Sequence, residues 1–318
     1  MAVVDIVTGE VIDPKEYRGV WYSASLLEDM AQCPAKAYGR ITKQKQMNPG
    51  LALINGIAVH YGMERWLKDR KDPIKTYNDT YKLEAEKQGV NWKSDEAEEK
   101  RREGEKMLAA TWAQYKDPRF LERVDPKLVE PKFRVMRDGR MFVGKLDLLF
   151  FKEPGRYNYV DFKSSKNPPS QWELDNDIQF NLYPWASFYS DELPTNGIWP
   201  EYGVWFHMRG KNITKGDDGK TKRLKNGEKW GDDPSRVWQF DFRTTPTKQS
   251  VDQIFKDTID PLCADIEDGR WRRNRTADCN YCPFFNKMKN QCGAELPMDG
   301  LAERSNQISL LDVDPKAA

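Results

Sequence analysis

The sequence has no long apolar run and no basic leader, and these two absences limit where the protein can reside. No segment approaches the roughly 20 consecutive apolar residues that a transmembrane helix needs, so we expect no membrane contact. Residues 1–14 carry acidic groups and no basic group, which does not fit a secretory signal peptide. We therefore expect a cytoplasmic protein.

The sequence also lacks a charge excess of either sign. Its 51 Lys and Arg against 50 Asp and Glu leave a net charge of +1, so overall charge does not reveal a nucleic-acid partner. Hydrophobic residues make up 38% of the 318 residues, which is typical of a globular protein with a real core. This length allows one large domain or two modest ones.

Helices are expected to dominate the first third of the chain. Ser25 and Glu28 have capping-box spacing before an apolar run, so a short helix should begin there and be broken at Cys33-Pro34. Longer helices are predicted over about 50–69 and 94–116. The pattern then changes to the two-residue period of strands, and Asp138-Gly139 is a strong hairpin signal. The later predictions are strands over 129–136, 141–151, 157–163, 202–208 and 237–242, with helices over about 171–190 and 247–268.

This order of elements predicts a mixed α/β core with helical additions. We interpret residues 1–300 as one domain with a helical part at 20–120, a core at 125–245 and a helical, cysteine-rich cap at 246–295. Residues 301–318 have the composition of a disordered tail.

Three charged residues lie in strands that are otherwise apolar. Asp147 is surrounded by Leu and Phe, and a buried carboxylate is costly unless it is paired or binds a cation. Asp161 and Lys163 are two residues apart on one predicted strand and so point to the same face. Carboxylates hold Mg²⁺ or Mn²⁺, and a lysine can stabilise charge on a phosphate. A structural Asp–Lys salt bridge is the alternative interpretation of this pair.

Other motifs, in a fixed order, accompany these charged residues. Gly56 and His60 are four residues apart on one helix, and Gln179 and Tyr183 are four apart on the helix after Lys163. Together with Gly144-x-x-Asp147 and Asp161-Phe162-Lys163, the set resembles the RecB-like branch of the PD-(D/E)XK nuclease superfamily. The resemblance extends from about residue 23 to residue 292, and Glu130 stands where that family often keeps a further acid.

The resemblance implies a restriction-endonuclease-like core, in which helices flank a mixed central sheet, and it implies roles for the motif residues. His60, Asp147, Asp161 and the main-chain carbonyl of Phe162 would bind the metal ions. Lys163 would be the catalytic lysine, and Gln179 and Tyr183 would position DNA or the surrounding active-site groups. Core packing is the alternative for Tyr183, and the later His207 is expected to be structural.

Four of the five cysteines form a candidate ligand set. Cys279 and Cys282 form a Cys-x-x-Cys pair, Cys292 follows, and Cys33 stands near the start of the chain. In the resembled branch, which includes AddB and the CRISPR-associated adaptation nucleases, one early and three late cysteines hold a [4Fe–4S] cluster. Zinc is the alternative metal. The gap before Cys292 is longer than in those relatives, so Cys263 is a substitute, although it also fits as a small buried apolar residue.

Two further motifs concern partners. Gly219-Lys220-Thr221 lacks the leading glycine of a phosphate-binding loop, so we expect no ATP binding. The segment Gln307–Leu311 resembles the short motif by which bacterial replication and repair proteins dock on the sliding clamp, and a disordered tail could present it.

The sequence therefore predicts a metal-dependent deoxyribonuclease that degrades DNA from an end and prefers single strands. Its setting would be phage or bacterial DNA replication, recombination or repair. A structure-specific endonuclease of the same fold is the nearest rival. A DNA-binding iron–sulfur or zinc protein without catalysis is the rival from another class, but such a protein would usually have lost one of Asp147, Asp161 and Lys163.

Overall fold

The structure is a computed structural model. It describes residues 2–44, 50–116, 118–164, 170–208, 239–244 and 246–274, together with residues 279, 282–286, 291–294 and 296. The predicted clamp motif and the polar loop after residue 208 lie outside these residues. No helix in the described part of the chain is long and apolar enough to cross a membrane.

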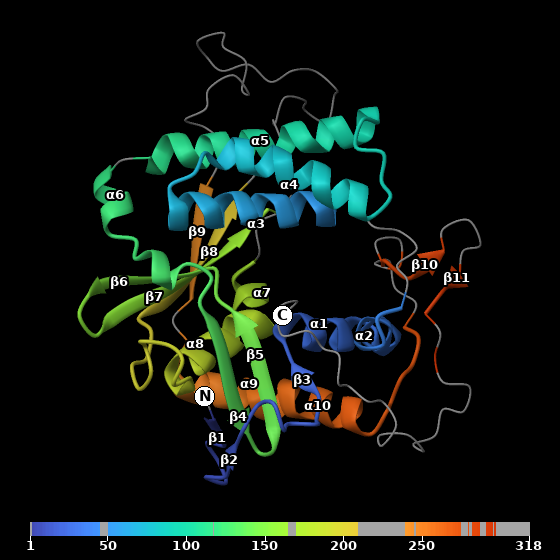
Figure 1. Ribbon diagram of the computed structural model, residues 1–318. Coiled ribbons are helices and arrows are strands. Elements are labelled where there is room, and N and C mark those ends of the chain that lie inside the picture. Colours follow the sequence, from blue (N-terminus) through green and yellow to red (C-terminus); the bar gives the residue numbers. More distant parts are fainter. Residues whose placement is uncertain are drawn as a thin grey trace.

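A four-stranded mixed sheet forms the centre of the molecule (Figure 1). Its order is β6 (Leu148–Glu153), β7 (Arg156–Lys163), β8 (Tyr202–Met208) and β9 (Gln239–Thr244). Only the β7–β8 pair is parallel, and Asp161 lies opposite Trp205 in its register. Between β7 and β8 the chain leaves the sheet and returns through helices, as a parallel connection requires.

A second sheet has the order β3 (Trp21–Tyr22), β5 (Arg140–Lys145) and β4 (Lys132–Arg137). The predicted Asp138-Gly139 turn joins β4 to β5, and both turn residues have positive φ. The prediction of one continuous strand over 141–151 was wrong. The chain divides it into β5 and β6, which belong to different sheets, and Asp147 lies at the break.

Three helices cover one face of the four-stranded sheet (Figure 1): α3 (Leu51–Asp69), α4 (Pro73–Lys87) and α5 (Asp95–Tyr115). The buried side chains Val59 and Met63 of α3 pack there with Leu148, Phe162 and Phe206 of the sheet. The helices predicted over 50–69 and 94–116 are confirmed, whereas α4 was not predicted. The short helix α6 (Pro118–Glu122) and a 3-10 turn at Pro126–Leu128 lead from this layer to β4.

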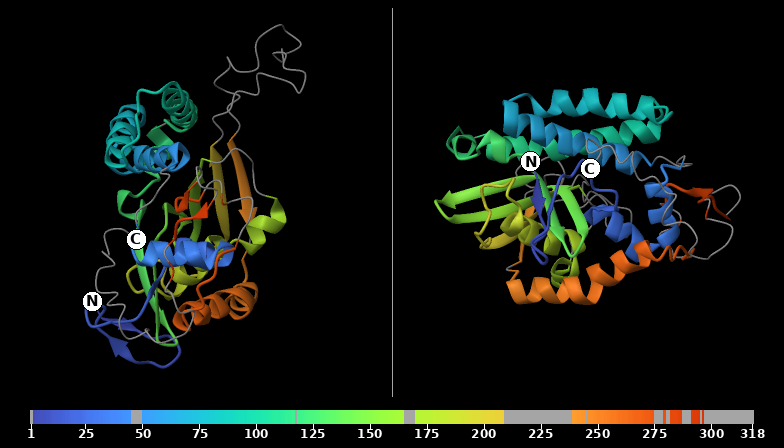
Figure 2. Two further views of the ribbon diagram at one scale, coloured as in Figure 1. Left: turned by 90° about the vertical axis from the view of Figure 1, so that its right-hand side faces the viewer. Right: turned by 60° about the horizontal axis from the view of Figure 1, so that its bottom comes forward.

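The opposite side of the core is covered by other helices, as the two views of Figure 2 show. They are α1 (Ala24–Gln32), α2 (Pro34–Ile41), α7 (Gln171–Asn176), α8 (Ile178–Tyr189) and the joined run of α9 (Lys248–Ile254), a π-helical turn (Phe255–Ile259) and α10 (Asp260–Glu267). Tyr157 and Tyr159 of β7 pack on this side, so alternate residues of that strand serve two separate cores.

Two helix boundaries in the structure differ from the predicted ones. In both cases a polar side chain caps the helix at a residue other than the predicted one. Ser23, not Ser25, caps α1 by accepting a hydrogen bond from the main-chain N–H of Leu26 at 3.3 Å. The helix predicted over 171–190 is interrupted at Asp177, whose carboxylate accepts from the N–H of Phe180 at 2.8 Å and begins α8. The short strands β1 (Val3–Val4), β2 (Val11–Ile12), β10 (Phe285–Asn286) and β11 (Gln291–Cys292) form two small antiparallel pairs.

The helical layer provides a stability test at Gly104 on α5. A Cβ atom there would lie 2.3 Å from the Tyr77 hydroxyl and 2.4 Å from the Asn55 side-chain oxygen, which are hydrogen-bonded to each other. Gly→Ala inside a helix normally stabilises by up to about 1 kcal/mol, but overpacking costs about 1–3 kcal/mol. We therefore expect Gly104→Ala to lower the free energy of unfolding in urea titrations.

The matched control is Gly56→Ala on α3, where the nearest atom to an added Cβ, the Ser164 hydroxyl oxygen, is 3.9 Å away. This variant should be as stable as the wild type or slightly more stable. Equal effects of the two substitutions would contradict the packing described for α4 and α5.

Candidate active site

Asp147 and Glu130 are brought side by side by main-chain hydrogen bonds where β5 ends and β6 begins. The N–H of Glu130 donates to the carbonyl of Asp147 at 3.0 Å, and the N–H of Leu146 donates to the carbonyl of Pro131 at 3.1 Å. Glu130 adopts a left-handed backbone conformation with φ of 54°, which non-glycine residues rarely take. The two carboxylates therefore leave the same irregular segment of chain.

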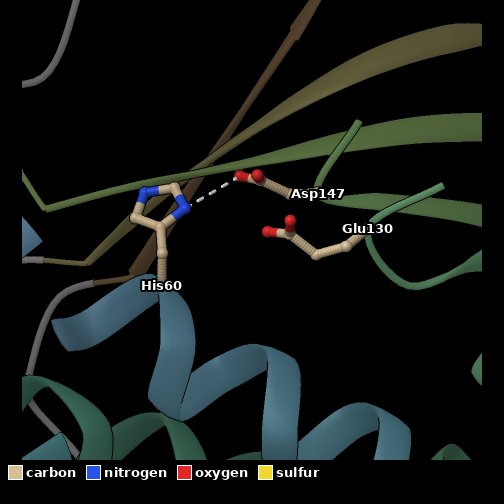
Figure 3. A group of neighbouring side chains, drawn as sticks. All are labelled: His60, Glu130 and Asp147. Carbon is tan, nitrogen blue, oxygen red and sulfur yellow. Dashed lines mark ion pairs between the residues drawn. The ribbon is translucent and has the colours of Figure 1, made fainter. Parts of the chain in front are cut away.

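His60 of α3 completes a group of three potential metal ligands with these carboxylates (Figure 3). One ligand atom from each of His60, Glu130 and Asp147 lies within 4.8 Å of the others. The Nδ1 atom of His60 is 3.4 Å from Oδ2 of Asp147. His60 and Glu130 are half-buried, and the His60 side chain is 32% exposed. Helix α3 thus brings His60 next to Asp147, where the resemblance placed it.

Asp161 and Lys163 meet on one face of β7, as their spacing predicted. Lys163 Nζ lies 2.8 Å from Asp161 Oδ2, and the Asp161 side chain is only 1% exposed. Gln179 of α8 bridges the pair, since its amide nitrogen donates to Asp161 Oδ1 at 3.0 Å and its amide oxygen accepts from Lys163 at 2.5 Å. The same nitrogen donates to the Tyr183 hydroxyl, so all four predicted residues form one hydrogen-bonded chain.

Phe162 connects the two groups of side chains. Its main-chain N–H donates to Oδ2 of Asp147 at 2.6 Å, while Asp161 and Lys163 flank it in the sequence. The Asp147 carboxylate is thus fixed against the strand that carries the Asp161–Lys163 pair. The carboxylates of residues 147 and 161 consequently belong to one site and influence each other's ionisation.

Two opposing effects set the pKa values of the site residues: burial disfavours the charged form of each group, and neighbouring opposite charges favour it. Burial alone would lower the pKa of His60, but the adjacent Asp147 carboxylate outweighs it and raises that pKa. Burial would raise the pKa of Asp147, but His60 and the Phe162 N–H hold it below its ordinary value. Asp147 is therefore ionised and ready to bind a cation at neutral pH.

Asp161 and Lys163 behave as a buried pair. Burial, together with the negative charge of Asp147, raises the pKa of the Asp161 carboxyl, although Lys163 opposes the shift. Burial would lower the pKa of Lys163, but the Asp161 carboxylate dominates and raises it. The lysine is therefore a fixed positive charge, which suits stabilisation of an anion rather than proton abstraction.

Three acids of the site were not assigned from the sequence. Glu130 was noted only as a family acid, yet it lies in the three-ligand group, and burial raises its pKa while Lys145 opposes the shift. Glu28 of α1 and Asp177 lie close enough to Lys163 to interact with it electrostatically. The positive φ of Glu130 has no sequence signature, and the helix faces of Glu28 and Asp177 depend on tertiary packing.

Several cysteines of the predicted ligand set lie near one another. Cys33, Cys282 and Cys292 border one small apolar cluster with Phe284. Cys33 Sγ accepts from the N–H of Asn274 at 3.4 Å, and Cys279 Sγ donates to the carbonyl of the same residue at 3.6 Å. Among the described residues, none of the five cysteines forms a disulfide.

Cys263 lies in a different part of the molecule. It is fully buried on α10 within the main core, and burial raises the pKa of its thiol. This placement agrees with the interpretation of Cys263 as a small buried apolar residue.

Solved structures and a protein-family model match this chain. A solved structure described as a "Putative exonuclease" from Eubacterium rectale matches with a TM-score of 0.50 and 13% identity, covering 90% of this chain and 93% of that one. A protein named SSO0001 matches with a TM-score of 0.33 and 12% identity over 86% of each chain. No curated protein matches the sequence. The model of the PD-(D/E)XK nuclease superfamily matches residues 22–286, and the chain therefore belongs to that superfamily.

Proposed function

We propose that this nuclease is a metal-dependent DNA exonuclease that prefers single strands and acts in phage or bacterial DNA replication, recombination or repair. One observation carries the catalytic part of the proposal. The hydrogen bond from the Phe162 N–H to Asp147 joins the three-ligand group of His60, Glu130 and Asp147 to the Asp161–Lys163 pair. The exonuclease part rests on the description of the Eubacterium rectale neighbour.

The donor atoms fit a divalent cation such as Mg²⁺ or Mn²⁺. Two carboxylates are the oxygen ligands that both ions prefer, and an imidazole favours Mn²⁺ over Mg²⁺. We assign His60, Glu130 and Asp147 as the primary ligands. Asp161 and the carbonyl of Phe162 are the further proposed ligands, since both belong to the β7 segment that binds Asp147.

The remaining residues act on the substrate phosphate and on each other. A bound cation supplies Lewis acidity at a phosphoryl oxygen and lowers the pKa of a water molecule. Lys163 places a fixed positive charge where negative charge builds on the phosphate. Gln179 holds Lys163 and Asp161 in place, and Tyr183 anchors Gln179 from the buried side of α8.

The first test is the loss of activity in Lys163→Ala. We expect cleavage of end-labelled single-stranded DNA with Mn²⁺ to fall about 100-fold or more, because a preorganised positive charge at the phosphate is removed. Lys87→Ala is the matched control, since Lys87 pairs with Glu84 on the surface of α4. Wild-type rates in Lys163→Ala would contradict the assignment.

Strand ends provide the test of exonuclease action. An exonuclease needs a terminus, so circular single-stranded DNA should stay intact while the linearised form of the same molecule is degraded to small products. Cutting of the circle would favour the endonuclease rival. Binding of DNA without any cleavage, in the presence of Mn²⁺, would favour the rival without catalysis.

We also propose that Cys33, Cys279, Cys282 and Cys292 hold a [4Fe–4S] cluster, with zinc as the alternative. Four thiolates suit either metal centre. Support comes from the meeting of Cys33 with Cys282 and Cys292, and from the hydrogen bonds of Cys33 and Cys279 to Asn274. Such a centre would link α1 to the end of the described chain.

The cysteine proposal is tested by metal content. Cys282→Ser should lose most of the bound iron or zinc and, for an iron–sulfur cluster, the visible absorbance. Cys263→Ser should keep both, because Cys263 is buried away from the other four. Visible absorbance with iron indicates the cluster, zinc without it indicates the alternative, and an unchanged metal content in Cys282→Ser refutes both.

Docking on a sliding clamp through Gln307–Leu311 stays a prediction.

A further inference from the structure

A cavity of about 370 Å³ lies between helix α3 and the face of the four-stranded sheet that this helix covers. Alternate residues of three neighbouring strands form its floor, and Trp66 of α3 forms part of its roof. Phe162 and Phe206 are among the aromatic rings of its wall. Its volume lies within the range of small-ligand sites.

The cavity begins next to the three-ligand metal group. Met63, in its wall, is one helical turn beyond His60 on α3. Leu148 directly follows Asp147 in the chain, and the main chain of Phe162 binds the Asp147 carboxylate. These residues form the end of the cavity nearer to the metal group, whereas the exposed Lys152 lies further along β6.

Asn158 adds a side-chain amide to the lining of the cavity. This residue is only 4% exposed, and its side-chain oxygen has no hydrogen-bond partner among the described residues. A buried acceptor without a donor destabilises the fold, so the Asn158 amide favours a ligand that carries hydrogen-bonding groups over one that carries none.

Two cations lie among the lining residues. The Arg123 guanidinium carbon is 5.0 Å from the centre of the Phe150 ring, and Lys152 Nζ is 4.6 Å from the centre of the Tyr202 ring. Lys152 also donates to Glu201 at 2.8 Å, so its charge is partly compensated. A wholly aliphatic ligand would use neither these cations nor the Asn158 amide.

An unstacked nucleobase matches these groups better. It is flat, stacks on aromatic rings, carries N–H donors on its Watson–Crick edge and brings a negatively charged backbone. We propose that the cavity receives one unpaired nucleobase of the strand being cut. The proposal rests on the proposed nuclease function and gives a structural cause for a single-strand preference, because a paired base cannot enter.

The test scans single-stranded oligonucleotides that each lack one base, with binding measured by fluorescence anisotropy in Ca²⁺. We expect one abasic position to weaken binding about tenfold or more, and the other positions to have little effect. The variant Val160→Trp fills the floor of the cavity. This variant should bind the intact strand as weakly as the wild-type protein binds the strand that lacks the critical base. Its affinity should be the same for every abasic strand of the scan.

The matched control is Val11→Trp, the same exchange at a residue that is 63% exposed on β2, which should keep the wild-type pattern. A second scan with 2-aminopurine in the wild-type protein needs no variant, and it should show an emission change at the same single position. Equal binding of all abasic strands, or a position effect that survives in Val160→Trp, overturns the proposal.

DNA cleavage, assayed in parallel, distinguishes failure of the nuclease proposal from failure of the cavity proposal. A position effect without cleavage refutes the nuclease activity and leaves the cavity assignment standing. Cleavage without a position effect refutes the cavity assignment alone.

Discussion

The Asp147 carboxylate lies beside three segments that are far apart in the sequence or belong to different elements. It accepts the N–H of Phe162 from β7, faces the imidazole of His60 from α3, and stands beside Glu130 at the entry to β4. A carboxylate that is only 11% exposed is tolerated when hydrogen bonds and positive charge replace its hydration. The same partners fix where its free lone pairs point. The site therefore depends on the helical layer and both sheets keeping their relative positions.

The division of the strand predicted over 141–151 has a direct chemical consequence. In a regular strand, Asp147 would lie within the hydrogen-bonded ladder of a sheet, and its side chain would point to one face of that sheet. The break between β5 and β6 frees this segment to pair with the chain around Glu130, through the two main-chain hydrogen bonds that bring their carboxylates together. Because β7 serves two cores, its odd-numbered residues carry the Asp161–Lys163 pair on one side, while Val160 and Phe162 line the cavity on the other.

Residue spacing in the sequence predicted those contacts of the site whose two residues lie on the same helix or strand. The two-residue spacing of Asp161 and Lys163 and the four-residue spacing of Gln179 and Tyr183 each lie within a single strand or helix, and the structure reproduces both as contacts. The place of His60 was inferred from family resemblance. Glu130 was underestimated because its position depends on a positive φ and on pairing with Leu146–Asp147, which are tertiary features. The split at Asp177 and the helix α4 were missed for a different reason. The capping residues Asp177 and Asp72 are local features, but apolar periodicity does not register a capping side chain.

The central claim is that His60, Glu130 and Asp147 together hold a divalent cation. The most direct test is anomalous diffraction from crystals soaked in Mn²⁺. The account predicts a peak about 2.0–2.6 Å from one ligand atom of each of these three residues. A Mn²⁺ peak elsewhere, with the imidazole of His60 still facing an ion-free Asp147, would contradict it.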